Sequence, residues 1–278
     1  MLSSAVVENK IISLRDINNI VGAMKAYAGS TLRKAEATVH NIRMCEASIR
    51  EAMSMIVSHH PSLARDVAGG GKRILVAFGS SVGLCGAFND KMTDALGSLI
   101  TDNDALIVIG RKLRRLAASQ KISSVGYFDA PASLDGIRES LRQSLSSIRT
   151  LYAMAEYFSL AFVYMTVPEN HAEIVIEQVL PPDIGEDADR RGDYSLLTYE
   201  HPDVVFAGIL DEFLSTSLYR CYVESLRSEN WFRLKAMEGA SENLRQRIVE
   251  LGSLQNYIRQ EEVTEEMLEI LGGGCFYR

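Results

Sequence analysis

Proline is absent from both ends of this chain, and that absence permits two very long helices. All six prolines fall between residues 61 and 202, and proline is the residue that breaks helices most strongly. Along the N-terminal end, one seam of apolar and small residues repeats at alternating steps of three and four. Its members are Leu14, Ile17, Val21, Met24, Ala28, Thr31, Ala35, Thr38, Ile42, Cys45, Ile49, Ala52 and Ile56. The seam predicts a helix from about residue 4 to residue 58, which would be ~80 Å long.

The C-terminal end carries a second narrow seam, which consists of Met237, Ala240, Leu244, Ile248, Leu251, Gln255 and Ile258. Such a seam needs a partner helix, and Gly272 to Gly274 provide residues that can end it. Residues 1–60 hold seven basic and five acidic side chains, whereas residues 203–278 hold eight and thirteen. The opposite net charges favour pairing of the two helices. Because they flank a compact insert, we expect an antiparallel coiled coil.

The insert alternates strand and helix patterns. Strands are predicted at 73–78, 105–109, 122–128, 160–167 and 173–180, and helices from Asp90 with Asn89 as N-cap, at 111–119 and at 134–157. Alternation favours a parallel sheet, and the last two strands read as an antiparallel hairpin at its edge. The fold class is therefore α/β, a coiled coil with an inserted Rossmann-like open sheet. The expected domains are 1–60 and 203–278 for the helices and 61–202 for the sheet and linker.

Composition excludes several classes of protein. The 278 residues are 47% apolar with a net charge of −7, which suits a packed core and argues against nucleic acid as the main partner. The four cysteines form no Cys-x-x-Cys pair and predict a reducing, cytosolic-side location. The N-terminus has no basic region followed by an apolar run, and nowhere do about 18 apolar residues run together. We therefore expect neither export by that route nor a membrane span.

One glycine loop stands where doubly wound proteins bind phosphate. Residues 79–86, GSSVGLCG, follow the first predicted strand. The loop lacks the Gly-Lys-Ser/Thr ending of a nucleoside-triphosphate loop and does not fit G-x-G-x-x-G. The run from Gly69 to Lys72 precedes the strand and suits a linker. No nucleotide or other cofactor is expected.

Cys85 lies at the strand-to-helix turn, where a hydrolase would place its nucleophile. The surrounding pattern lacks the second glycine of G-x-S-x-G, and His171 and His201 carry no motif. A buried structural thiol is the better interpretation. Two further groups show no ligand spacing, so neither a catalytic nor a metal site is expected; these are His59 with His60, and Glu186, Asp187 and Asp189. A hydrolase or nucleotide-binding domain with coiled-coil arms remains the alternative, and a generic coiled-coil scaffold a third possibility.

Three stretches, in the same order, resemble one family. Residues 18–35, NNIVGAMKAYAGSTLRKA, are similar to the N-terminal signature of the gamma subunit of F-type ATP synthases. Residues 83–89, GLCGAFN, resemble that family's D-R-G-L-C-G-G-F-N. Residues 233–273 resemble its ending, with RLKAM, NYIRQ and EEMLEILGG in place. The resemblance covers nearly the whole chain.

The resemblance implies a non-catalytic rotor. In that family the paired helices thread the hexamer of alpha and beta subunits, and the α/β domain sits on the membrane c-ring and binds the epsilon subunit. Rotation links proton or sodium flow to ATP synthesis or hydrolysis. The implied location is peripheral, on the cytoplasmic face of the inner membrane, within a hetero-oligomer.

The resemblance also assigns contact residues by position. Arg259 and Gln260 match the pair that contacts the beta-subunit catch loop, and Met24 and Lys25 fall where the shaft meets the moving beta levers. Tyr199 and Glu200 match a Tyr-Glu near the ring or epsilon contact. The departures are Ser81 and Val82, which replace the family's Asp-Arg, His201 after the Tyr-Glu, Gly22 and Gly29 inside the first helix, the acidic Glu262 and Glu266, and the bulky ending Cys275-Phe276-Tyr277-Arg278.

Overall fold

A computed structural model describes residues 4–63, 72–154, 157–183 and 198–274. The chain divides into two compact units, and each is described by itself. The helix-pair unit comprises residues 1–28 and 234–278, and the sheet unit comprises residues 29–233. Two helices contribute to both units: α1 (Ser4–His59) and α5 (Pro202–Gly274).

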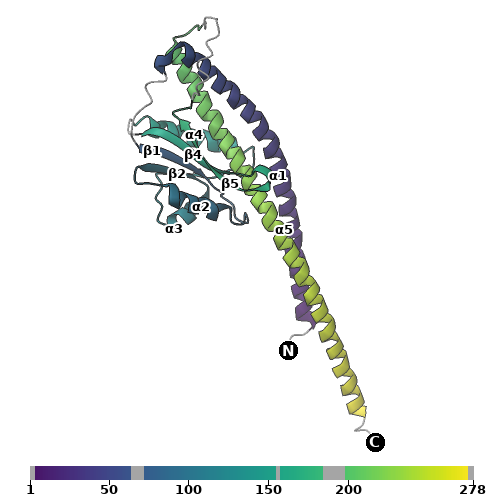
Figure 1. Cartoon of the computed structure of the whole chain (residues 1–278). Coiled ribbons are helices and arrows are strands. Elements are labelled where there is room, and N and C mark those ends of the chain that lie inside the picture. The colour runs from purple at the N-terminus through teal and green to yellow at the C-terminus, as the bar shows by residue number, and fades with distance from the viewer. Residues whose placement is uncertain (1–3, 64–71, 155–156, 184–197, 275–278) are drawn as a thin grey trace. The chain divides into compact units, whose positions relative to one another are not determined.

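The sheet unit is built on five strands, β1 (Lys72–Phe78), β2 (Asp104–Ile109), β3 (Gly126–Phe128), β4 (Tyr157–Thr166) and β5 (Glu173–Leu180). Their order is β3-β2-β1-β4-β5, and Figure 1 labels β1, β2, β4 and β5. All neighbours are parallel except β4 and β5, which pair antiparallel at one edge. The predicted α/β sheet with an antiparallel edge hairpin is confirmed.

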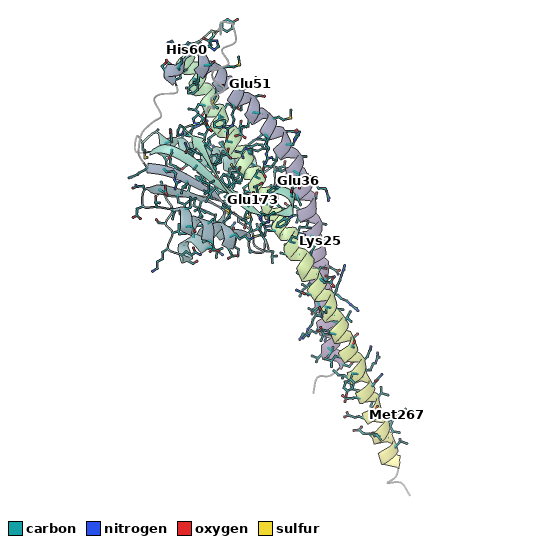
Figure 2. All side chains as sticks on the ribbon, in the orientation of Figure 1. Lys25, Glu36, Glu51, His60, Glu173 and Met267 are labelled. Carbon is teal, nitrogen blue, oxygen red and sulfur yellow. The ribbon has the colours of Figure 1, made fainter. Side chains whose placement is uncertain are left out.

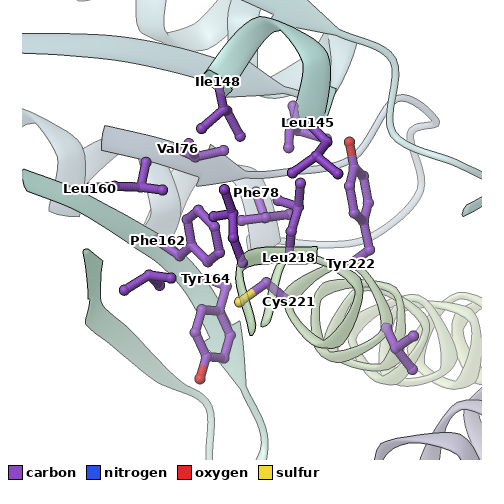
Figure 3. Packing of buried hydrophobic residues seen from close by; sticks show 14 of the residues in the cluster. Val76, Phe78, Leu145, Ile148, Leu160, Phe162, Tyr164, Leu218, Cys221 and Tyr222 are labelled. Atoms are coloured by element: carbon purple, nitrogen blue, oxygen red, sulfur yellow. The ribbon is translucent and has the colours of Figure 1, made fainter. Parts of the chain in front are cut away.

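Alternate side chains of the strands pack on opposite faces of the sheet, as the two-residue period of a strand requires. Ile74, Val76 and Phe78 face a core shared with α4 (Ile137–Tyr152) and with parts of α1 and α5. Leu75 and Ala77 face a second core formed with α2 (Phe88–Leu99) and α3 (Arg111–Ser119). In Figure 3, side chains from the sheet, α4 and α5 converge around Phe78. The Phe78 and Tyr222 rings pack edge to face, with their centroids 5.2 Å apart.

Three predicted boundaries in the sheet unit are corrected. β3 spans three residues, because the Ile122 N–H donates to Ala117 at the end of α3 and not to a neighbouring strand. α4 is shorter at both ends than the predicted 134–157. Asn89 is not an N-cap: α2 already begins at Phe88, and the Asn89 side chain turns back to the glycine loop.

The helix seams agree with the prediction unequally. Every residue of the C-terminal seam is buried or half-buried, with Met237 at 4% and Leu251 at 7% exposure. On α1, the predicted seam members Ile17 and Cys45 are exposed. At three positions after Ala35, the seam shifts by one residue: Val39, Glu46 and Met53 are buried where Thr38, Cys45 and Ala52 were predicted. A straight helix drifts by ~20° per heptad from a 3.5-residue repeat, so one strict register cannot describe the whole of α1.

Within the helix-pair unit, α1 and α5 run antiparallel. The Ser4 N–H donates to Glu262 Oε1 at 3.1 Å, whereas further along α1 the Asn18 Oδ1 accepts from Ser241 Oγ at 3.0 Å. Val7, Ile11 and Leu251 form the buried apolar contact between the two helices. The predicted antiparallel pairing is confirmed here.

Candidate functional site

Met24 and Lys25 lie on α1 in the helix-pair unit. Met24 is half-buried, and Lys25 is exposed. The Lys25 Nζ lies 3.3 Å from Glu238 Oε1 on α5, and both side chains remain more than 40% exposed. Figure 2 labels Lys25 on this helix. The pair is reachable from solvent, so a partner could exchange one of its members for a contact of its own.

Arg259 and Gln260 lie on an exposed face of α5. With Asn256, Val263 and Thr264 they line a hollow on that face. The hydroxyl of Thr264 donates to the Gln260 carbonyl oxygen at 2.7 Å, so it bonds to its own helix. Arginine offers five donors and glutamine both donors and an acceptor, and here their side chains stay exposed. This face presents polar groups for hydrogen bonding to another molecule.

Beyond Glu262, α5 carries large apolar side chains in water. Glu262 lies opposite the first described residue of α1, Ser4, and α5 continues to Gly274. Figure 2 shows Met267 projecting from this stretch. The exposed apolar residues are Val263, Met267, Leu268, Ile270 and Leu271, each 49% to 75% exposed. Soluble proteins seldom expose so contiguous an apolar surface unless a partner covers it.

Tyr199 and Glu200 belong to the sheet unit and stand just before α5. Tyr199 is fully exposed, and Glu200 is exposed. The next residue, His201, contacts the Asp203 carboxylate at 2.8 Å through Nδ1, and its carbonyl oxygen accepts the N–H groups of Val204 and Val205. The turn is therefore fixed at its helix end, and the tyrosine and glutamate are left facing solvent.

The structure does not gather the predicted contact residues into one site. Lys25 faces Glu238, and Arg259 lies about 30 Å further along α5 at 1.5 Å per residue. They are separate positions along one helix pair. Contact residues spread along a helix pair suit a chain that binds other molecules at several points along its length. An active site instead requires its groups to lie within hydrogen-bonding reach of one another.

The glycine loop is held by its own side chains. Asn89 Oδ1 accepts from the Ser80 N–H at 3.0 Å, and its Nδ2 donates to Ser80 Oγ at 2.8 Å and to Cys85 Sγ at 3.3 Å. Gly79 also has a steric role, because an added Cβ would lie 2.4 Å from Leu113 Cβ. The hydrogen bonds hold the loop closed, and Gly79 allows α3 to pack closely against the sheet.

Cys85 is poorly placed to act as a nucleophile. Its side chain is 3% exposed, and burial raises the pKa of the thiol. A nucleophilic cysteine needs the opposite, a lowered pKa and access to substrate. Its hydrogen-bonding partners are Ser80, Val82 and Asn89, whereas His171 and His201 are exposed. The geometry favours the structural interpretation of this thiol.

Ser81 replaces the charge pair of the resembled family with a hydrogen-bonding hub. Its Oγ accepts from the Ala130 N–H at 2.7 Å and from the Arg111 N–H at 3.3 Å, and it donates to Asp129 Oδ1 at 3.1 Å. Arg111 also reaches the Asp129 carboxylate at 3.4 Å. The loop thus joins the ends of three strands without its own charges.

A buried charged group was not predicted from the sequence. Arg220 on α5, 5% exposed, contacts Glu46 on α1 and Glu177 on β5. The available signal was an arginine inside the apolar run LYRCYV and a glutamate beside the predicted seam at Cys45. A charge in such a run requires a partner when the run is buried.

The described part of the chain contains no cluster of three or more potential metal ligands and no helix long and apolar enough to cross a membrane. Several residues considered earlier lie outside the described ranges, namely Gly69 to Gly71, Glu186, Asp187, Asp189 and Cys275 to Arg278.

Comparison with known proteins gives a consistent result. A family model described as ATP synthase matches residues 3–274. An ATP synthase gamma chain of Bdellovibrio bacteriovorus is 27% identical, with 98% of both chains covered. One from Clostridium novyi is also 27% identical, over 96% of this chain and 95% of that protein.

Solved structures share the fold at low sequence identity. A central-stalk chain of the Tetrahymena thermophila mitochondrial ATP synthase has a TM-score of 0.60 at 16% identity, over 80% of this chain and 99% of that one. A chain of the Euglena gracilis mitochondrial ATP synthase has a TM-score of 0.56 at 14% identity, over 91% and 94%.

Proposed function

The chain belongs to the ATP synthase family, and from that membership we propose that it is the central rotor shaft of an F-type ATP synthase. It would couple proton or sodium movement through a membrane ring to ATP synthesis or hydrolysis in a hexamer of alpha and beta subunits. The observation that carries the proposal is the antiparallel helix pair, whose longer member ends in exposed apolar residues past Glu262.

That apolar end suits a turning contact. Hydrophobic burial is non-directional, so an apolar surface can rotate within an apolar collar without breaking directional bonds at each angle. The side chains of Met267, Leu268 and Ile270 offer such a surface, and each is more than 60% exposed. We assign this end to a bearing inside the hexamer.

In the same proposal, the polar contact residues form directional hydrogen bonds that depend on the angle of the shaft. Arg259 and Gln260 would hydrogen-bond the catch loop of a beta subunit, and Met24 and Lys25 would meet its moving levers. Tyr199 and Glu200 would contact the ring or the epsilon subunit. Met24 is half-buried and the others are exposed, so a partner can reach each of them. The expected domain division is part of the same proposal: residues 1–60 and 203–278 form the shaft, and residues 61–202 form the domain that sits on the ring.

The chain itself would be non-catalytic and would need no cofactor. Its place would be peripheral, on the cytoplasmic face of the membrane, held there by the other subunits. The alternative is a hydrolase that uses Cys85. That interpretation is disfavoured by the buried thiol, whose pKa is raised. Cys85→Ala should leave ATP turnover of the assembled complex unchanged, and loss of a hydrolytic activity in the purified chain would favour the hydrolase.

The decisive experiment is co-expression of the chain with the alpha and beta subunits from its own source, followed by ATPase assay. We expect a stable complex whose turnover falls in the Arg259→Ala/Gln260→Ala variant. The chain contains a matched control on the same helix, Arg245→Ala/Gln246→Ala, which removes the same two exposed residue types. Failure of the three subunits to associate would overturn the rotor proposal, and an equal loss in both variants would overturn the assigned contact.

A further inference from the structure

An ionic cluster with a buried centre joins both long helices to the sheet inside the sheet unit. We call it the ionic joint; it consists of Glu46, Arg50, Tyr164, Glu177, Ser217 and Arg220. Arg220 is its centre: Nε lies 2.6 Å from Glu46 Oε2 on α1, and Nη2 lies 2.6 Å from Glu177 Oε2 on β5. Nη1 donates to the Tyr164 hydroxyl on β4 at 2.8 Å. One guanidinium therefore connects four elements.

The remaining members leave the carboxylates fully engaged. Ser217 Oγ donates to Glu46 Oε1 at 2.8 Å, and the Tyr164 hydroxyl donates to Glu177 Oε2 at 3.0 Å. Arg50 lies 3.5 Å from both glutamates. Among the described residues, no buried side-chain nitrogen or oxygen lacks a hydrogen-bonding partner.

A second link stands one helical turn along α5. Glu224 is fully buried, and its Oε1 lies 2.5 Å from Arg43 on α1. Its Oε2 accepts from the Thr166 hydroxyl on β4 at 3.5 Å and lies 3.5 Å from Arg227. This second link connects three of the four elements of the joint, α1, α5 and β4, and its Arg43 side chain is exposed.

Stability alone does not account for this arrangement. Buried ion pairs lose so much hydration that apolar residues of similar volume often stabilise a fold equally well or better. What charged hydrogen bonds add is direction: a guanidinium held by two carboxylates fixes distance and angle at once. Apolar packing alone allows one helix to shift past another by a ridge or a turn. The ionic joint opposes both rotation of α5 about its axis and sliding along α1.

We propose that the ionic joint is a positioning element that transmits torque between the long helices and the sheet. This inference rests on the proposed rotor function. In a rotor, the helices turn inside the hexamer while the sheet domain turns the ring, so twist must pass from one to the other. Arg220, Glu46 and Glu177 resist that twist through short charged hydrogen bonds, whereas the apolar core beside them resists compression.

The test measures torsional stiffness in the assembled complex. The hexamer is fixed to a surface, and a gold rod is attached to the sheet unit through Ser98→Cys, an exposed position on α2, in a Cys45→Ser/Cys275→Ser background. The angular variance of the rod is recorded while the complex pauses. Glu177→Gln keeps the shape but removes one charge, and Arg220→Lys keeps the charge but removes the planar fork. Each should raise the variance roughly twofold, since each weakens a shared network.

The matched control is Glu139→Gln, which breaks an exposed ion pair with Arg142 on α4, 2.7 Å long and away from the joint. It should leave the variance unchanged. Thermal stability of each complex is measured in parallel, because a purely structural role would lower the melting temperature without changing the variance below it. Unchanged variance in both joint variants would overturn the inference. A parent complex that never turns the rod would instead overturn the rotor function.

Discussion

The two units of this chain are stabilised in opposite ways. The sheet unit buries aromatic rings and a whole ion pair, with Arg220 at 5% and Glu46 at 6% exposure. The helix-pair unit has one small apolar cluster around Leu251, together with the solvent-exposed Lys25–Glu238 pair. The sheet unit therefore supplies its own core. The helix-pair unit leaves apolar surface exposed, which is typical of a surface that binds other molecules.

The largest expected effect is in the sheet unit. Arg220→Met leaves the buried Glu46 and the half-buried Glu177 without their central partner, and breaking one side of a buried pair costs about 3–5 kcal/mol. Urea unfolding of the purified chain, followed by fluorescence of Trp231, measures the free energy. Glu139→Gln, which breaks an exposed pair, should leave the free energy of unfolding nearly unchanged. Similar losses in the two variants would remove the distinction between buried and exposed pairs.

A paired truncation compares the two apolar cores. Leu218→Ala empties a fully buried site of the sheet core, with an expected cost of about 3–4 kcal/mol. Leu251→Ala acts in the helix-pair cluster, 7% exposed, and should cost about 2 kcal/mol because two helices can close partly over the gap. Hydrogen exchange resolved by segment reads each unit separately. Equal costs would mean that the helix pair is as rigidly packed as the sheet core.

Glycine substitutions should act in opposite directions in the two units. Gly22 lies in α1 with nothing within 4 Å of an added Cβ, so Gly22→Ala should stabilise the helix by roughly 1 kcal/mol. That corresponds to about fivefold slower hydrogen exchange over residues 4–28. Gly79→Ala should destabilise the sheet unit, because its Cβ would meet Leu113 at 2.4 Å. Slower exchange in both variants would contradict the assigned packing.

The sequence predicted the elements better than their interior. Periodicity depends on which residues face inward, and the helices, most of the strands and the C-terminal seam follow from it. The predicted α1 seam is wrong at Cys45, which is exposed, whereas the charged side chain of the next residue, Glu46, is buried. Its burial is possible only beside Arg220, which is 174 residues away in the sequence. Local pattern contains no information about such a partner.

The candidate sites show the same limit. The structural interpretation of Cys85 came from an incomplete motif and agrees with its burial. The hydrogen bonds of Ser81 to Ala130 and Asp129 were not predictable, since they depend on where the end of β3 meets the glycine loop. Arg259, Gln260, Tyr199 and Glu200 were assigned by resemblance. Their exposure is compatible with a contact, but the contact itself stays a prediction.

The smallest effect is expected at the Lys25–Glu238 pair. A double-mutant cycle of Lys25→Ala and Glu238→Ala in the isolated chain should give a coupling energy below about 1 kcal/mol, because both side chains are solvated and screened. The coupling should fall further at 1 M salt. In the assembled complex, Lys25→Ala should affect turnover more than Glu238→Ala if Lys25 exchanges this partner for one on a beta subunit. Equal effects on turnover would restrict the pair to holding α1 and α5 together, and the helix-pair unit would then lose one of its proposed external contacts.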